Sequence, residues 1–301
     1  MVTLLDRPTV GRRLLDVWAL GRPWFWPVSL LPYAVGVLLA THRLVPAPAQ
    51  WPRLAVGAVV AGPLVWLAVL AVNDAHDLAG DLRNPRKAGG PLTSGRMSTR
   101  TARHVSVAAG AAAVLTALAV GVQFSLGTVA VLALGWAYSA PPLRLKARPG
   151  ADVAVNAIAV GAMGPLAGFT AVQSIAGFPW PIALQGTLVG AALYLPTTLV
   201  DYRSDLASGY DTIAVRWGPR RTYLLGLALW SAAAVLSVLL AATDTVIPRR
   251  MLPFEAVMVP GLVLAYHLIL RRIRAFRGIV LLSFLFLVPS GVFALVYTGI
   301  L

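Results

Sequence analysis

The eleven acidic residues of this 301-residue chain are unevenly placed, because six of them fall in two short segments. In the first segment, Asp74, Asp77 and Asp81 stand at i, i+3 and i+7 and share one face if the segment is helical. Asn73 precedes them and adds an amide oxygen. Like charges on one face repel unless a cation lies near them. A hard divalent cation with oxygen ligands would provide that compensation.

The second segment has the same helical spacing. Asp201 and Asp205 stand at i and i+4 after an apolar run that ends at Val200. Asp211 lies beyond Gly209, where we expect the helix to end, so it is the poorer candidate ligand. A single aspartate at such a place would be a solvated helix end. Two clusters with helical spacing instead favour a metal site.

Two opposed carboxylate clusters with Mg²⁺ would form a receptor for a diphosphate. Mg²⁺ binds through a few carboxylates and completes its coordination with substrate phosphate oxygens. The metal and nearby cations would neutralise the leaving pyrophosphate, and an apolar bundle beside the site would shield an allylic cation from water. The pattern predicts ionisation of an isoprenoid diphosphate, with Asp77, Asp201 and Asp205 as candidate catalytic residues.

Membrane-spanning helices must position these segments. The chain is 58% hydrophobic and only 12% charged, whereas a soluble domain carries about 25% charged residues. A span needs roughly 20 mainly apolar residues. We predict an all-α integral membrane protein, one domain over residues 1–301, whose nine spans are Trp24–Ala40, Leu54–Asn73, Val105–Val122, Leu126–Ser139, Asp152–Val172, Pro181–Val200, Tyr223–Ala241, Pro253–Leu270 and Ile279–Tyr297.

Basic residues predict the orientation of this bundle. With the N-terminus in the cytoplasm, only Arg43, Arg53, Arg249 and Arg250 of the 25 Lys and Arg lie in outside loops. This asymmetry follows the positive-inside rule. Both acidic segments then end their helices on the cytoplasmic side. We expect a multi-pass protein of the bacterial cytoplasmic membrane with its active site on that side.

Composition argues against several other classes. The chain has no cysteine, which excludes disulfides, thiolate metal sites and a cysteine nucleophile, and its four histidines are scattered. The net charge of +14 fits cytoplasmic flanks that contact anionic membrane lipid. We therefore expect membrane lipid, and no nucleic acid, as a partner.

Four segments resemble motifs of the UbiA superfamily of intramembrane prenyltransferases. Residues 73–81, N-D-A-H-D-L-A-G-D, are similar to the first motif of that family, and residues 201–212, D-Y-R-S-D-L-A-S-G-Y-D-T, resemble the second. Residues 138–146, Y-S-A-P-P-L-R-L-K, resemble its cytoplasmic loop, and residues 91–95, P-L-T-S-G, resemble the stretch after the first motif. The order, the separations and nine spans fit, so the resemblance covers nearly the whole chain.

The resemblance implies a metal site with two ions. Asn73 and Asp77, with either Asp74 or Asp81, would bind one Mg²⁺. Asp201 and Asp205 would bind a second.

The resemblance also implies roles for cations. Lys146 and Arg144 would contact the diphosphate, although basic residues after a helix stop also fit ordinary cytoplasmic flanking. Arg22 would line the acceptor side, or would anchor its helix at the membrane interface.

One position departs from the family pattern. Many members carry Arg immediately before the Pro-Leu that matches residues 91–92, whereas this chain has Gly90. Arg83, Arg86 or Lys87 from the same loop would then supply the diphosphate-binding cation.

The predicted function is Mg²⁺-dependent transfer of a prenyl group from a prenyl diphosphate to a lipophilic, aromatic acceptor. Two alternatives stay open. An intramembrane terpene cyclase of the same superfamily would ionise the same diphosphate without an acceptor. An ion-coupled transporter would use membrane-embedded acids as an ion path.

Overall fold

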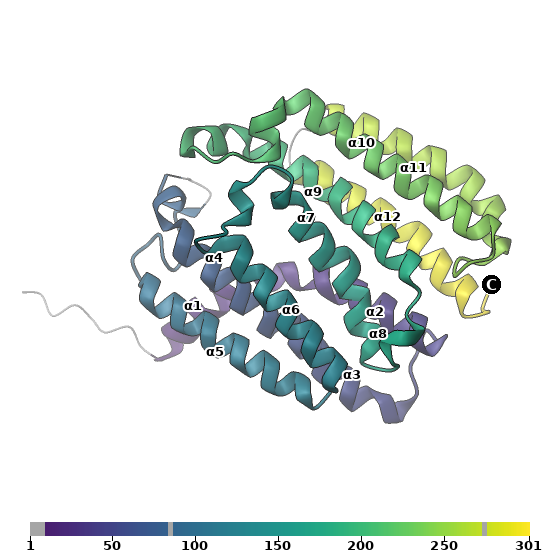
Figure 1. The fold of residues 1–301 in the computed structure, drawn as a ribbon, viewed down its shortest axis with the longest axis horizontal. Coiled ribbons are helices and arrows are strands. Elements are labelled where there is room, and N and C mark those ends of the chain that lie inside the picture. Colours follow the sequence, from purple (N-terminus) through teal and green to yellow (C-terminus); the bar gives the residue numbers. More distant parts are fainter. Residues whose placement is uncertain (1–9, 84–86, 273–275) are drawn as a thin grey trace, which may run out of the picture.

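The computed structural model describes residues 10–83, 87–272 and 276–301, which form a helical bundle (Figure 1). Within these residues there is no strand, and nine helical units are long and apolar enough to cross a membrane. The predicted number of spans is therefore confirmed. The units are Val10–Thr41, Pro48–Asp81, Thr99–Leu118, Val122–Ser139, Ala151–Thr170, Trp180–Ser208, Ile213–Ala242, Arg249–Arg272 and Phe276–Tyr297.

Three of the units contain more than one α-helix. Short π-helical segments, η3 (Val60–Leu64) and η6 (Ile158–Ala162), join helices within two spans, and Pro63 accounts for the first because its ring removes a backbone donor. The α-helices are α1 (Val10–Gly21), α2 (Trp26–Thr41), α3 (Trp51–Val59), α4 (Val65–Asp81), α5 (Thr99–Leu118), α6 (Val122–Ser139), α7 (Ala151–Ala157), α8 (Met163–Thr170), α9 (Trp180–Ser208), α10 (Ile213–Ala242), α11 (Leu252–Arg272) and α12 (Phe276–Tyr297).

Some span boundaries differ from the sequence prediction. The second span was expected to stop at Asn73, but α4 continues to Asp81, so all three aspartates of the first motif are helical. The third was expected to reach Val122, but α5 ends at Leu118 because the chain turns at Gly121, whose φ of 144° suits glycine. Hydropathy marks the apolar part of a helix and not its polar last turns.

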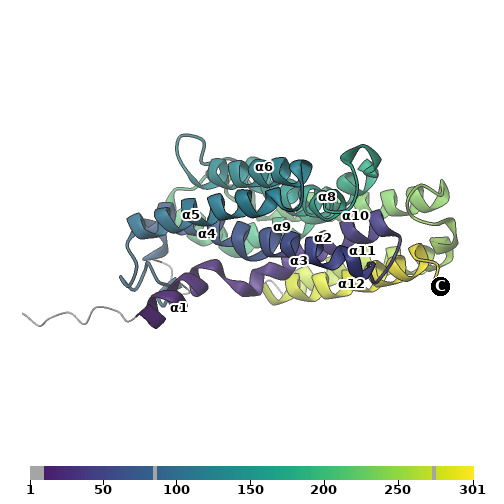
Figure 2. The same cartoon turned by 90° about the horizontal axis from the view of Figure 1, so that it is seen from below.

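Chain neighbours pack beside one another across the bundle. Helices α4, α5 and α6 lie together at one side, α9 to α12 lie at the other, and α2, α7 and α8 fill the middle (Figure 1). Seen from below, α4 and α5 again lie toward one end of the molecule and α10 and α11 toward the other (Figure 2). Helices of the two halves thus surround the middle of the molecule.

Glycine allows the closest helix contact in the middle of the bundle. A Cβ added at Gly168 of α8 would lie 1.8 Å from the carbonyl oxygen of Tyr33 in α2, and one added at Gly36 would lie 1.9 Å from that of Pro165. Small residues let backbones approach where lipid gives no hydrophobic driving force between helices. The α2–α8 contact thus fixes two walls of the bundle interior.

Candidate active site

Both aspartate motifs line one cavity, although they belong to α4 and α9. The cavity has a volume of about 1070 Å³, at the upper end of the range of about 300–1,000 Å³ for small-molecule sites. Its polar wall contains Asn73, Asp77, Asp81, Asp201 and Asp205. We call this region of the bundle, defined by those five residues, the carboxylate end.

A direct hydrogen-bond chain joins the two motif regions. The Tyr210 hydroxyl, just beyond the second motif helix, donates to Asp77 Oδ1 of α4 at 3.1 Å. Arg144 Nη2 donates to the Tyr210 oxygen at 3.0 Å and to Asp77 Oδ1 at 3.3 Å. Burial, together with the Asp77 carboxylate, raises the pKa of Tyr210 to about 12, so the hydroxyl stays a donor at neutral pH. The sequence prediction did not single out Tyr210.

Among the predicted site cations that the structure describes, Lys146 is the most deeply buried. Its Nζ lies 2.6 Å from Asp77 Oδ2 and donates to Asn73 Oδ1 at 2.8 Å. Burial lowers the pKa of Lys146, and the adjacent Asp77 carboxylate opposes that shift. Ser139, the last residue of α6, also donates to Asn73 Oδ1, at 3.2 Å. The loop after α6 thus brings its lysine onto the first motif.

The three aspartates of the first motif do not have equivalent surroundings. Asp74 accepts two hydrogen bonds from Arg22 Nη2, at 2.6 and 2.8 Å, and does not line the cavity. Asp81 does line it and pairs with Lys87 Nζ at 2.7 Å. Arg22 lines the cavity as well. Of the two alternatives for a third ligand, Asp81 is the one with access to the cavity.

Among the described residues of the loop after α4, one cation, Lys87, lines the cavity at the carboxylate end. Arg83 is exposed and does not line it. Arg86 lies outside the described residues. Gly90 is the position that departs from the family pattern. A Cβ added there would lie 3.1 Å from Thr93 Oγ1 and 3.3 Å from the Lys87 carbonyl oxygen. The backbone around Gly90 is therefore folded tightly on itself.

The second motif ends its helix as the sequence predicts. Helix α9 stops at Ser208, and Gly209 caps it with a φ of 70°. Asp205 Oδ2 accepts a hydrogen bond from Thr212 Oγ1 at 3.2 Å. Asp211 is half-exposed, stands outside the cavity lining and accepts from Arg216 Nε at 3.0 Å.

Asp152 is a cavity-lining acid that sequence reasoning missed as a site residue. It is 1% exposed, and its Oδ2 accepts from the backbone N–H of Ile213 at 3.0 Å. Its Oδ1 is buried and has no hydrogen-bond partner among the described residues. Asp152 stands in the first turn of its helix, where an acidic side chain commonly interacts favourably with the positive end of the helix dipole. That position made Asp152 look like an ordinary helix start.

The donor set of the carboxylate end suits Mg²⁺ chemically. Among the described residues no three His, Cys, Asp or Glu side chains already converge on a metal position. Mg²⁺ does not require a complete protein cage, since it is held by one or two carboxylates together with substrate phosphates and water. The available ligands, carboxylates and the Asn73 amide, offer oxygen atoms only.

Away from the carboxylate end the cavity is mainly apolar. Its walls there include Phe25, Trp66, Phe124, Met163 and Leu166. An ionic head group and a long apolar tail would therefore find matching surroundings in one continuous space. In a helical protein with nine apolar spanning units, such a cavity suits an enzyme that acts on amphiphilic substrates inside the bilayer.

The chain belongs to the UbiA prenyltransferase family, whose model matches residues 29–288. It is similar to the lycopene elongase/hydratase of Haloarcula japonica, with 30% identity over 71% of each chain. It is also similar to a 4-hydroxybenzoate octaprenyltransferase of an Enterobacter species, with 32% identity over 76% of this chain and 78% of that one. The protein is thus a prenyltransferase and a multi-pass integral membrane protein.

A solved structure shares the fold. The UbiA homologue from Archaeoglobus fulgidus bound to GPP and Mg²⁺ superposes with a TM-score of 0.75 at 24% identity, covering 94% of this chain and 97% of that one. Family membership also leaves the transporter alternative without support.

Proposed function

We propose that this protein transfers the prenyl group of an isoprenoid diphosphate to a lipophilic, aromatic acceptor and releases pyrophosphate. One observation carries the proposal: both aspartate motifs border one end of a cavity whose remaining wall is mainly apolar. A similar chain is named 4-hydroxybenzoate octaprenyltransferase, which supports an aromatic acceptor. The cytoplasmic face of a bacterial inner membrane is the proposed location of the site, on the charge asymmetry of the loops.

At the carboxylate end, the acidic residues and Asn73 would bind the metal, and the basic residues around them would bind the diphosphate. Asn73, Asp77, Asp81, Asp201 and Asp205 would hold Mg²⁺, which when bound would neutralise charge on the diphosphate oxygens. When the diphosphate is bound, its oxygens would replace the aspartates as partners of three cations, Lys146, Arg144 and Lys87. Asp74 would keep Arg22 in place at the cavity wall, since the two side chains share two short contacts.

The apolar wall would control what happens to the allylic group. It would hold the tail in an extended position and exclude water from the carbon that becomes cationic as the C–O bond breaks. Tyr138 and Tyr194, whose hydroxyls lie 2.7 Å apart at the cavity, would face that carbon from the polar side. The acceptor carbon would then form the new bond and lose a proton to a nearby base or to the pyrophosphate.

The test is a reaction with purified protein, prenyl diphosphates and Mg²⁺, each with and without aromatic acceptors such as 4-hydroxybenzoate. Mass spectrometry should detect a prenylated acceptor and pyrophosphate, and both should disappear with EDTA. Asp77→Ala and Asp201→Ala should abolish turnover while the protein still elutes as a folded monodisperse species.

Two results would contradict the proposal in different ways. Hydrocarbon or alcohol products from the diphosphate alone would identify a terpene cyclase. Full activity of either alanine variant in Mg²⁺ would reject the aspartate mechanism.

A further inference from the structure

The first spanning unit is longer than a bilayer requires. Val10–Thr41 contains 32 residues, which as one helix would be about 48 Å long, whereas the hydrocarbon core is about 30 Å thick. The unit is broken at Arg22, whose φ is 43°, and continues with η1 (Pro23–Phe25) and α2. Together η1 and α2 are about 30 Å long, which is enough to cross. The membrane crossing therefore does not need α1.

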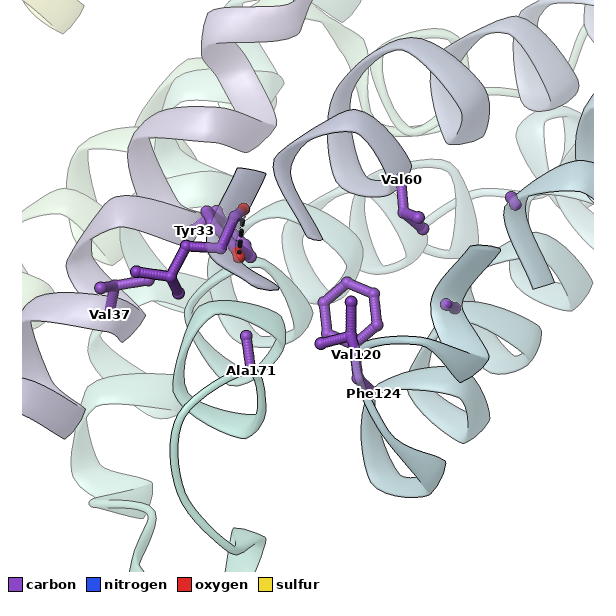
Figure 3. Close-up of a cluster of buried hydrophobic side chains, with 9 residues drawn as sticks. Tyr33, Val37, Val60, Val120, Phe124 and Ala171 are labelled. Carbon is purple, nitrogen blue, oxygen red and sulfur yellow. Dashed lines mark hydrogen bonds between the residues drawn. The ribbon is translucent and has the colours of Figure 1, made fainter. Parts of the chain in front are cut away.

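Helix α2 is the part of this unit that lies inside the bundle. Tyr33 and Val37 of α2 pack in a cluster of buried side chains that includes Val60 (Figure 3). The Tyr33 hydroxyl donates to the carbonyl oxygen of Leu54 in α3 at 3.0 Å. Helix α1 instead runs obliquely along the edge of the molecule (Figure 2). Its position needs a separate explanation.

The outward face of α1 is apolar. Val10, Leu14 and Trp18 stand at i, i+4 and i+8, so they share one face, and they are 75%, 66% and 57% exposed. We call these three residues the apolar stripe. The other side of α1 packs on the protein, where Leu20 is fully buried in a cluster with Leu92. A helix at a water-covered surface turns its polar face outward, so the stripe indicates that lipid covers α1.

Tryptophan side chains show at which depth α1 lies. The Trp18 ring meets Trp26 of α2 edge to face, with 5.2 Å between the ring centroids, and Trp24 between them is also exposed. Tryptophan is enriched where the hydrocarbon meets the lipid head groups. Arg13, on α1 itself, is exposed and suits the phosphates at that level. The junction of α1 and α2 therefore lies at the membrane interface.

The inner face of α1 contacts the loop that follows the first aspartate motif. Asp16, which is buried, accepts a hydrogen bond from Arg96 Nε at 2.8 Å. Arg96 Nη2 donates to the carbonyl oxygen of Gly89 at 3.2 Å. The same loop contains Lys87, which lines the cavity. One short helix thus has an exposed apolar face on one side and a loop of the candidate active site on the other.

We propose that α1 is an interfacial helix whose apolar stripe lies in the lipid leaflet at the carboxylate end, and that this lipid contact stabilises the loop after α4. The partner is the boundary between lipid head groups and acyl chains. Helices of this kind bury their apolar face about 5–10 Å into that boundary. The inference goes beyond the proposed function, because it concerns a lipid surface and not the prenyl reaction.

The first experiment measures which solvent surrounds the apolar stripe. Because the chain has no cysteine, a single nitroxide can be attached in turn to Leu14→Cys and Trp18→Cys. In nanodiscs of phosphatidylcholine and phosphatidylglycerol, both labels should collide more often with oxygen, which concentrates in lipid, than with a water-soluble nickel chelate. Arg13→Cys is the matched control. It is exposed on the same helix and lies about 100° around the axis from Leu14, so its label should favour the nickel chelate.

The second experiment measures amide hydrogen exchange of the loop after α4 in the same nanodiscs. The backbone N–H groups of Ser94 and Met97 donate to the carbonyl oxygens of Gly90 and Pro91. Leu14→Asp, which puts a charge on the stripe, should make these amides lose protection, because the loop opens more often. Leu14→Phe keeps the stripe apolar and should exchange as the wild type does.

The outcomes test the lipid contact and its effect on the loop separately. A label at Leu14 that favours the nickel chelate would place the stripe in water. A label protected from both reagents would mean that a protein partner, such as a second copy of the chain, covers it. Unchanged exchange in Leu14→Asp would overturn the effect on the loop.

A further variant keeps this test valid if Leu14→Asp does not fold. Asp16→Ala removes the acceptor of Arg96 and leaves the stripe intact, so it should also speed exchange of the loop. Normal protection of the loop in Asp16→Ala would show that α1 does not stabilise it. Neither measurement uses a substrate, so failure of this inference would leave the proposed function untouched.

Discussion

At the residue scale, the first motif divides its carboxylates between two tasks. Asp77 is shared by Lys146, Arg144 and Tyr210, which come from two other segments of the chain. Asp74 pairs with Arg22 and does not line the cavity, whereas Asp77 and Asp81 do. The angle around the helix does not separate Asp74 from Asp81, because residues seven positions apart lie within about 20° of each other. They differ in position along α4, about two turns apart, and Asp74 is the one that meets Arg22.

Tyr210 should matter because it joins the two motif regions. Tyr210→Phe removes the donor to Asp77 and the acceptor of Arg144 and keeps the ring. A hydrogen bond to a charged group is worth about 1.5–3 kcal/mol, so we expect kcat/KM for the diphosphate to fall by about tenfold or more. Tyr223→Phe, which breaks a 2.7 Å contact with His267 outside the cavity, is the control and should stay near wild type. Equal losses in the two variants would remove the special role of Tyr210.

Asp74 and Asp81 should respond differently to the same substitution. Asp81→Asn should raise the Mg²⁺ concentration for half-maximal activity, because it removes a charge from the cavity wall. Asp74→Asn should leave that concentration unchanged and lower thermal stability by about 1–3 kcal/mol, because Arg22 loses its charged partner in a half-buried pair. Mg²⁺ titrations of activity and melting curves measure the two effects. A shifted Mg²⁺ requirement in Asp74→Asn would assign it to the metal.

At the element scale, the glycines between α2 and α8 are expected to control stability. Gly168→Ala places a methyl group 1.8 Å from the Tyr33 carbonyl oxygen, which forces the helices apart. Overpacking of this kind costs about 1–3 kcal/mol. Melting of the detergent-solubilised protein should therefore shift downward by several degrees, whereas Gly291→Ala on α12, with nothing within 4 Å, should melt as the wild type does. An unchanged melting temperature in Gly168→Ala would mean that the α2–α8 contact is looser than described.

Sequence patterns predicted the elements better than the contacts between them. Nine spans follow from hydropathy because each must bury its backbone in lipid without help from its neighbours. The acidic clusters stand out because charge is scarce in such a chain. The Arg22–Asp74 pair joins residues 52 positions apart, and Asp152 meets the backbone of Ile213 only through packing. No local spacing encodes either contact, so both required the folded chain.

At the scale of the whole molecule, the distribution of charge predicts which way the bundle crosses the membrane. The topology predicted from the sequence puts all but four of the 25 basic residues in segments on the same side as the two aspartate motifs. Because cytoplasmic loops retain Lys and Arg, the carboxylate end should face the cytoplasm. A substrate made in the cytoplasm would then reach the site without first crossing the bilayer.

The absence of cysteine makes this orientation directly measurable. Ala49, in the short 3-10 helix Pro48–Gln50 that begins the second spanning unit, and Ala88, in the loop after α4, are both exposed and lie at opposite ends of that unit. A membrane-impermeant maleimide added to intact spheroplasts should label Ala49→Cys and should label Ala88→Cys only after the membrane is permeabilised. The unsubstituted chain, with no thiol, gives the background. The reverse pattern would turn the site outward and would require its diphosphate substrate to be delivered from the other face, because a diphosphate carries charge that the bilayer core excludes.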